Sequence, residues 1–133
     1  MVTGSQEQLD DLVEEGLRFE PAAAIIPRRC SADTELGGMQ IKKGERALFA
    51  MAAANRDPQV FDDPDTFRPG RKQRHLSFGN GVHVCLGQHF ARAELAVGLR
   101  MLFERFPNMQ LAEGPVVYEG GLIRGPERLQ VVL

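Results

Sequence analysis

A cysteine framed by glycines carries the clearest chemical potential in this sequence. The segment from Phe78 to Gly87 reads Phe-Gly-Asn-Gly-Val-His-Val-Cys-Leu-Gly. Its closely spaced glycines allow a tight backbone path that side chains would obstruct. Cys85 lies just before a predicted helix, where free N–H groups and the positive end of the helix dipole favour a thiolate over a thiol. A thiolate held in this way can ligate a soft or borderline metal, and His83 offers a donor to a nearby anion.

The residues of this loop, taken alone, leave other interpretations open. A lone cysteine is most often a small buried hydrophobic residue. A Cys/His nucleophile pair is also possible, although no orienting partner for it can be placed. The third alternative is a zinc site whose spacing matches no usual finger or ribbon pattern, with candidate ligands His75, His83, Cys85 and His89.

Two helices flank the chain segments that must position the loop. Ser5 and Gln8 form a predicted capping box at the start of a helix over residues 6–19. A second helix is predicted over residues 87–105, and Pro107 ends it. Its apolar residues fall on one face at helical spacing, and they are Ala91, Leu95, Leu99, Leu102, Phe103 and Phe106.

Between the helices the pattern changes to short strands and loops. Residues 25–49 predict β segments around glycine-containing turns at 36–39 and 42–45, followed by a helical turn at 51–54. Residues 55–76 are rich in proline and aspartate with little periodicity, which indicates a segment held by other parts of the molecule. Short strands are predicted over 111–133. The fold class is therefore α+β.

Composition excludes several classes of function. The 133 residues are 43% hydrophobic and 26% charged, which is typical of one globular domain. A net charge of −2 gives no global basic field for nucleic acid. No apolar run approaches the ~20 residues of a membrane span, and no secretory signal is recognisable. Two cysteines cannot form a disulfide framework, so we expect a cytoplasmic protein with free thiols.

The cysteine loop resembles the heme-binding signature of the cytochrome P-450 family, Phe-Gly-x-Gly-x-His/Arg-x-Cys-x-Gly. Residues 88–95 continue the resemblance to the soluble bacterial class. The resemblance implies that residues 1–133 are the C-terminal, heme-ligating region of that mostly helical fold. It also implies that Cys85 is the axial thiolate ligand of heme b iron. The fixed positions of the signature are filled by Phe78, Gly79, Gly81, His83, Cys85 and Gly87.

A second family motif lies in the first predicted helix. Glu15 and Arg18 form an E-x-x-R pair on one helical face. An isolated pair of this kind is usually solvated and contributes about 0.3–0.5 kcal/mol. In the family the pair is buried and joined by an arginine that precedes the cysteine loop, and the matching residue here is Arg71. The resemblance thus implies a structural triad that orders residues 55–76.

The resemblance also implies partners for the two heme propionates. His83 is one, and Arg28 is the other. Arg29 would replace Arg28 if the alignment with the family shifted by one residue. Two apolar segments match those that face the substrate in the family, which indicates a small apolar organic substrate. Their residues are Ala23, Ala24, Ile25, Leu122 and Ile123.

The implied activity is O2-dependent hydroxylation by a heme-thiolate monooxygenase. Its electron donor would be a ferredoxin or flavodoxin-type protein, attracted by the basic run of Arg68, Arg71, Lys72 and Arg74. The family's oxygen-activation motif, Ala/Gly-Gly-x-x-Thr, does not occur in these 133 residues. We therefore expect that the chain alone is not a competent enzyme and either self-associates or requires an N-terminal companion. The alternative is a non-enzymatic heme-binding or interaction protein derived from a truncated cytochrome P-450.

Overall fold

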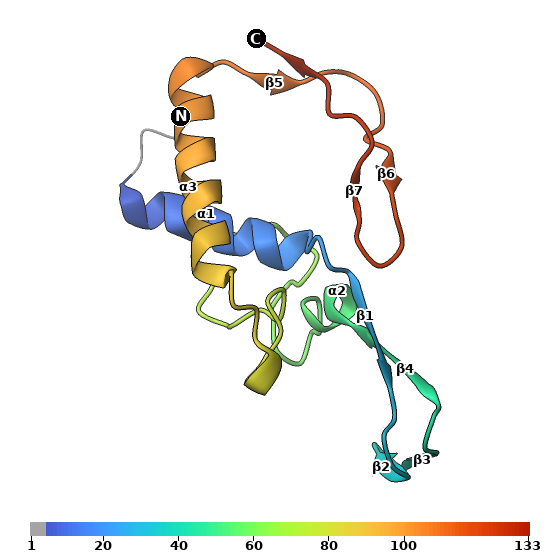
Figure 1. The fold of residues 1–133 in the computed structure, drawn as a ribbon. Coiled ribbons are helices and arrows are strands. Elements are labelled where there is room, and N and C mark those ends of the chain that lie inside the picture. Colours follow the sequence, from blue (N-terminus) through green and yellow to red (C-terminus); the bar gives the residue numbers. More distant parts are fainter. Residues whose placement is uncertain (1–4) are drawn as a thin grey trace.

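Two crossing helices form the centre of the protein, whose computed structural model describes residues 5–133. Helix α1 (Gln6–Phe19) lies against α3 (Gln88–Arg105), as Figure 1 shows. The predicted capping box is confirmed at the start of α1. The Gln8 N–H donates to the Ser5 hydroxyl at 3.3 Å, and the Ser5 N–H donates to the Gln8 side chain at 2.9 Å. The sequence therefore predicted the bounds of α1 correctly.

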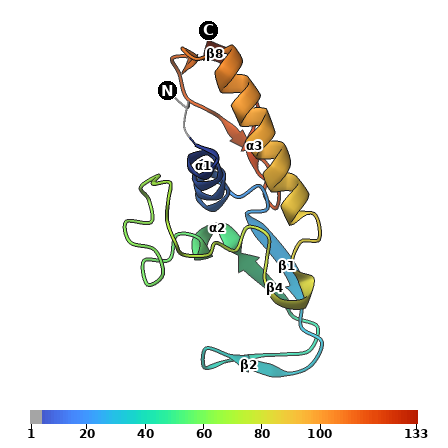
Figure 2. The same cartoon turned by 90° about the vertical axis from the view of Figure 1, so that its left-hand side faces the viewer.

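A long β arm projects away from the helices (Figure 2). Strand β1 (Ile25–Arg29) pairs antiparallel with β4 (Arg46–Ala50). Between them in the chain, β2 (Thr34–Leu36) and β3 (Met39–Ile41) form a second antiparallel pair. The turn between β2 and β3 requires positive φ at both central positions, which Gly37 and Gly38 adopt at 58° and 79°. The glycine pair therefore explains this hairpin.

The remaining elements are short. After α2 (Met51–Ala54) comes the irregular segment of residues 55–76, and then a 3₁₀ turn, η1 (Gly81–His83). The C-terminal residues form two antiparallel pairs: β5 (Gln110–Leu111) with β8 (Val131–Val132), and β6 (Tyr118–Glu119) with β7 (Gly125–Pro126). The α+β class predicted from the sequence is confirmed.

The hydrophobic core is small and lies beneath α1. Leu9 and Val13 contribute one face of α1, and Met51 comes from α2. Phe61 from the irregular segment is 2% exposed, so a stretch with no regular structure also contributes to the core. Helix α1 and its contacts therefore organise the fold.

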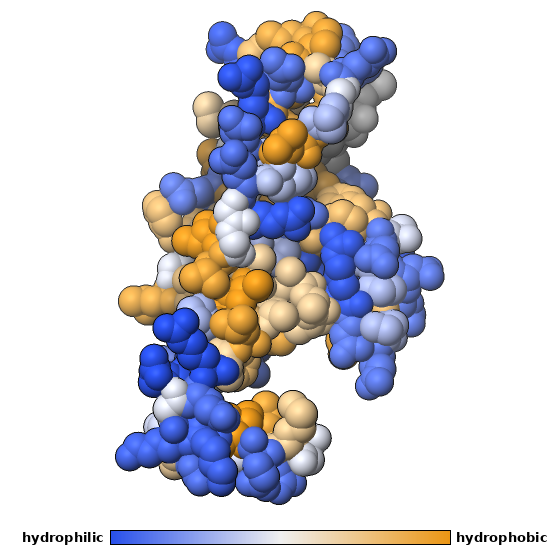
Figure 3. Space-filling view, turned by 90° about the vertical axis from the view of Figure 1, so that its right-hand side faces the viewer, coloured by the Kyte–Doolittle hydropathy of each residue, from blue (hydrophilic) through white to orange (hydrophobic). Residues whose placement is uncertain are grey.

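The predicted apolar stripe of α3 suggests that other elements bury one face of this helix, but much of that face is exposed to solvent. None of its residues is buried, although Leu99 and Phe103 are half-covered. A second apolar row, not recognised in the sequence, is formed by Phe90, Val97 and Met101, all mostly exposed. Figure 3 shows hydrophobic side chains across the middle of one face of the molecule. Among residues 5–133, no helix combines the length and apolar character that crossing a bilayer requires.

Candidate functional site

The cysteine loop folds back on itself through two glycines. Gly79 and Gly81 adopt φ of 73° and 72°, a region that residues with a Cβ rarely occupy. Their path lets the Cys85 N–H donate to the Phe78 carbonyl at 2.8 Å and closes the loop. The loop ends at Gly87, the residue that caps α3. The glycines therefore set the position of Cys85 relative to the helix.

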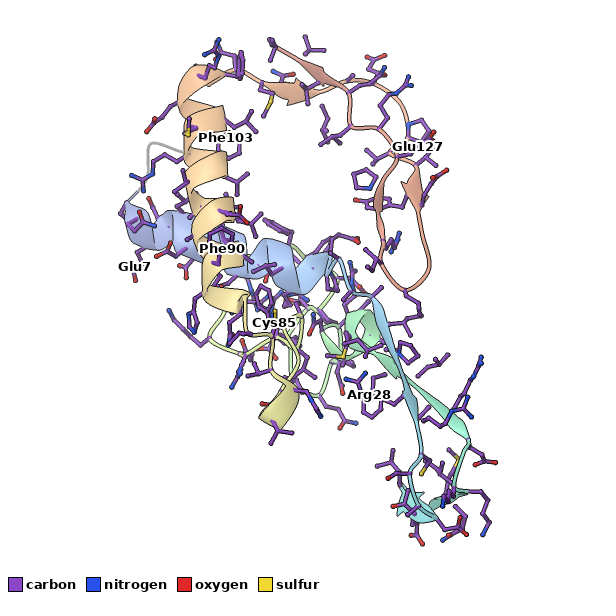
Figure 4. All side chains as sticks on the ribbon, in the orientation of Figure 1. Glu7, Arg28, Cys85, Phe90, Phe103 and Glu127 are labelled. Atoms are coloured by element: carbon purple, nitrogen blue, oxygen red, sulfur yellow. The ribbon has the colours of Figure 1, made fainter. Side chains whose placement is uncertain are left out.

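Cys85 lies at the start of α3 with its thiol accessible (Figure 4). The Gln88 N–H donates to the Cys85 carbonyl at 3.3 Å, which ties the cysteine backbone to the first turn of the helix. A Cβ added at Gly87 would lie 4.0 Å from the Cys85 Sγ. Glycine at this position therefore keeps the space beside the sulfur open.

Cys85 opens onto a cavity of about 540 Å³ between the loop and the β arm. Arg28 and His83 also line this cavity, and both side chains are exposed. Neighbouring residues of a strand point to opposite faces, which explains why Ile26 and Arg28 share the cavity. Arg29 instead donates to the Gly44 carbonyl at 2.7 Å on the β arm. Arg28 rather than Arg29 is therefore the arginine that lines the cavity with Cys85.

The donor set of the cavity fits a heme better than a coordinated metal ion. It combines one thiol with two side chains that carry N–H donors, Arg28 and His83, and an otherwise largely apolar wall. Such a wall suits a flat apolar ring, and the donors suit its carboxylates. In the described part of the chain, no group of three or more His, Cys, Asp or Glu side chains could hold a metal ion. The zinc alternative therefore has no geometric support.

The predicted substrate-facing segments lie side by side, but their residues have different surroundings. Ala23 lines the cavity and bridges to Ile123, which is 75% exposed. The Ile25 N–H donates to the Leu122 carbonyl at 3.4 Å, so the C-terminal segment returns to the start of β1. Ala24 is buried in the core instead. Ile26 of β1 also lines the cavity, although the sequence interpretation did not include it.

Glu15, Arg18 and Arg71 meet under α1. The Arg18 side chain donates to both Glu15 carboxylate oxygens at 2.8 Å, and the Arg71 Nε donates to Glu15 at 3.2 Å. All three side chains are at most 4% exposed. The backbone N–H of Arg68 adds a fourth donor at 2.7 Å. Although burial alone would raise it, these hydrogen bonds hold the pKa of Glu15 below its usual value.

The same cluster holds the irregular segment in place. Arg18 donates to the carbonyls of Asn55 and Pro64, each at 2.9 Å, and to that of Thr66 at 3.2 Å. Arg71 donates to the carbonyls of Asp63 and Thr66, at 2.9 and 3.0 Å. Backbone carbonyls that a strand or helix would otherwise pair are thus satisfied by two guanidinium groups. These bonds explain how a segment without regular structure stays ordered.

Asn55 is a buried linking residue whose role the sequence did not predict. It is 0% exposed. Its side-chain oxygen accepts from the Leu76 N–H at 2.7 Å, and its amide donates to the Ser77 hydroxyl at 2.8 Å. Ser77 in turn donates to the Leu17 carbonyl at 2.6 Å. Asn55 therefore connects the end of α1 with the residues that enter the cysteine loop.

A second polar cluster lies between α1 and α3. The Arg92 guanidinium donates to both carboxylate oxygens of Glu14, and this interaction lowers the pKa of Glu14. His75 lies beside them, with its Nε2 3.2 Å from a Glu14 oxygen. Burial lowers the pKa of His75, although the Glu14 charge opposes that effect. The sequence offered no sign of this cluster because its members are far apart in the chain.

The predicted basic run divides between the interior and the surface. Arg71 points inward to Glu15, whereas Lys72 and Arg74 are exposed. Arg68 is exposed too, and its guanidinium donates to the Asp62 carbonyl at 3.3 Å. Three of the four cations are therefore exposed on the surface.

Comparison with known proteins agrees with this geometry. A family model described as Cytochrome P450 matches residues 7–132. Nocardicin C N-oxygenase of Nocardia uniformis subsp. tsuyamanensis is 40% identical over 98% of this chain and 34% of its own length. Pulcherriminic acid synthase of Bacillus subtilis is 38% identical over 90% of this chain and 32% of its own length. The chain thus spans about a third of the length of these curated relatives.

Solved structures show the same fold. CYP109B1 from Bacillus subtilis superposes with a TM-score of 0.89 at 38% identity, over 96% of this chain and 35% of that one. P450BioI, solved in complex with a fatty-acid-ligated acyl carrier protein, gives a TM-score of 0.86 at 37% identity, over 96% and 34% of the two chains. The glycine-framed cysteine, the buried E-x-x-R pair and these matches lead to one conclusion. The chain belongs to the cytochrome P450 family.

Proposed function

We propose that this chain is the heme-thiolate region of a monooxygenase and ligates heme iron through Cys85. The observation that carries the proposal is the cavity in which an accessible thiol at a helix start faces Arg28 and His83. To bind heme by its sulfur-ligated side, a protein needs a thiolate ligand for the iron and hydrogen-bond partners for the propionates. The overall reaction would be O2-dependent hydroxylation of a small apolar organic substrate.

Each residue of the cavity has a separate task in this proposal. Cys85 supplies the sulfur, and the Phe78 carbonyl that accepts its N–H keeps the loop in one conformation. Arg28 and His83, which line the cavity, would donate to the carboxylates of a bound heme. The apolar walls formed by Phe78, Ile26 and their neighbours would pack against the heme ring. Heme, when bound, supplies the dioxygen-activating chemistry.

The redox partner follows from surface charge. Lys72, Arg74 and Arg68 are exposed cations within 17 residues of Cys85 in the sequence. An acidic ferredoxin or flavodoxin-type protein would be steered toward such a surface. The interaction should weaken as salt screens the charges.

Absorbance of the heme-loaded chain, reduced under carbon monoxide, tests the proposal. Thiolate ligation predicts a red-shifted Soret band that Cys85→Ala abolishes. Cys30→Ala is the matched control, because the Cys30 thiol donates to the Ala32 carbonyl at 2.8 Å and lies on the β arm. A red-shifted band that persists in Cys85→Ala would refute the assignment. Because the chain alone is not expected to turn over, product formation that requires an added companion chain with the Ala/Gly-Gly-x-x-Thr motif would favour the monooxygenase over the non-enzymatic alternative.

A further inference from the structure

We infer that Glu14, Arg92 and His75 form a positioning network that holds the cysteine loop against the crossing of α1 and α3. The inference rests on the proposed function, because the loop that is positioned carries the proposed heme ligand. It differs from the Glu15 cluster, which holds the irregular segment. The three residues come from α1, α3 and the chain segment that enters the loop.

Arg92 joins the two helices and the first turn of α3. Its Nη2 donates to a Glu14 oxygen at 3.0 Å, its Nε donates to the other oxygen, and the two residues are 78 positions apart. Its Nη1 donates to the Gln88 side chain at 3.1 Å. A bidentate guanidinium–carboxylate pair has a defined geometry, so it fixes the orientation of α3 at its N-terminal end.

The same guanidinium covers the aromatic ring that begins the loop. The Arg92 Cζ lies 4.6 Å from the Phe78 ring centroid, within the range of a cation–π interaction. The His75 ring lies 6.1 Å from the same Phe78 ring, centroid to centroid. Phe78 is the residue whose carbonyl accepts the Cys85 N–H. Fixing Phe78 therefore fixes the backbone of Cys85.

His75 completes the network from the loop side. Its Nδ1 accepts from the Ser77 N–H at 3.2 Å, so in the neutral imidazole the proton is on Nε2. That Nε2 is enclosed, makes no aligned hydrogen bond, and faces the Glu14 carboxylate at 3.2 Å. The charged groups around His75 are Glu14, Arg92 and Arg74. A small rotation of the Glu14 side chain would let its carboxylate accept from His75 Nε2 as well as from Arg92.

Amide hydrogen exchange of the heme-free chain tests the inference at the Cys85 N–H. Arg92→Met removes the guanidinium but keeps an unbranched side chain. We expect the Cys85 amide to exchange at least about tenfold faster in this variant, because the loop opens more often. Arg100→Met is the matched control. Arg100 also connects α3 to α1, through the Gln6 side chain, but Arg100 lies three helical turns from the loop.

Two further variants keep the test decisive if Arg92→Met fails to fold. Glu14→Gln retains side-chain volume and loses the charge that pairs with Arg92, and it should also accelerate Cys85 exchange. Arg92→Lys keeps the charge without the planar fork, so it should restore part of the protection. Exchange at Cys85 that is unchanged in Glu14→Gln, or equally fast in Arg100→Met, would overturn the inference.

Heme loading separates this inference from the proposed function. If both hold, the reduced carbon-monoxide complex of Arg92→Met should have a smaller fraction of the thiolate Soret band than that of Arg100→Met. If the unsubstituted chain shows no thiolate band, the proposed function fails while the exchange data still decide on the network. If the Arg92→Met and Arg100→Met spectra match, the network does not position the ligand.

Discussion

Replacing Glu15 with glutamine should destabilise the protein more than any exposed glutamate replacement does. The change keeps side-chain volume but removes a carboxylate that accepts four hydrogen bonds from Arg18, Arg68 and Arg71. Arg18 is 1% exposed and would keep a buried positive charge without its counter-ion. Breaking a buried pair on one side costs about 3–5 kcal/mol. Because Arg18 retains three carbonyl acceptors, we expect the lower end, about 3 kcal/mol.

Urea unfolding followed by far-ultraviolet circular dichroism measures this loss. The control is Glu94→Gln, an exposed position on α3, where a change within about 0.5 kcal/mol is expected. A variant that is already unfolded without urea sets a lower limit on the loss and agrees with the prediction. A loss below about 1 kcal/mol for Glu15→Gln would contradict the reasoning, because a loss that small is typical of a solvated surface ion pair rather than a buried one.

Three further predictions concern other parts of the molecule. Since folding lowers the pKa of His75, the unfolded chain takes up its proton first, so the free energy of unfolding should fall as pH drops below about 6.5 toward the folded-state pKa. His75→Asn should flatten this part of the pH profile of unfolding free energy, measured by urea titration. If its slope is unchanged in the variant, other titrating groups cause the pH dependence. Asn55→Leu leaves the Leu76 N–H without its acceptor and should cost about 1–3 kcal/mol, whereas the exposed control Asn108→Leu should have little effect in thermal unfolding. The chain should self-associate through the exposed side of α3 in sedimentation experiments, and Met101→Glu should shift it toward monomer, since each buried apolar side chain contributes about 1.5–3 kcal/mol; a monomer at all concentrations would contradict this.

Local features of the fold were predictable because their signals lie in neighbouring residues. The capping box at Ser5 predicted the start of α1, and the glycine pair at residues 37–38 predicted the β2–β3 turn. The positive φ of Gly79 and Gly81 agrees with the expected tight path of the cysteine loop. In each case the backbone conformation depends on side chains within a few residues.

Features that depend on distant contacts were not predictable in the same way. Glu14 and Arg92 have no periodicity or spacing that links them, and the choice of their partner depends on how α1 crosses α3. The linking role of Asn55 depends on its burial and on its bonds to residues 76 and 77, which no local pattern signals. The second apolar row of α3 was missed because the first row already satisfied the expected pattern. Tertiary packing, which the sequence pattern does not encode locally, decides the first two, whereas the second apolar row is visible in the local helical spacing.

The central claim is that Cys85 provides the sulfur ligand of heme iron. Iron K-edge X-ray absorption of the heme-loaded chain measures this directly, because it distinguishes sulfur from nitrogen and oxygen neighbours. We predict one sulfur neighbour at the iron in the unsubstituted chain and in Cys30→Ser, and none in Cys85→Ser. A first shell of nitrogen and oxygen alone in the unsubstituted chain, or a sulfur neighbour that survives Cys85→Ser, would contradict the account.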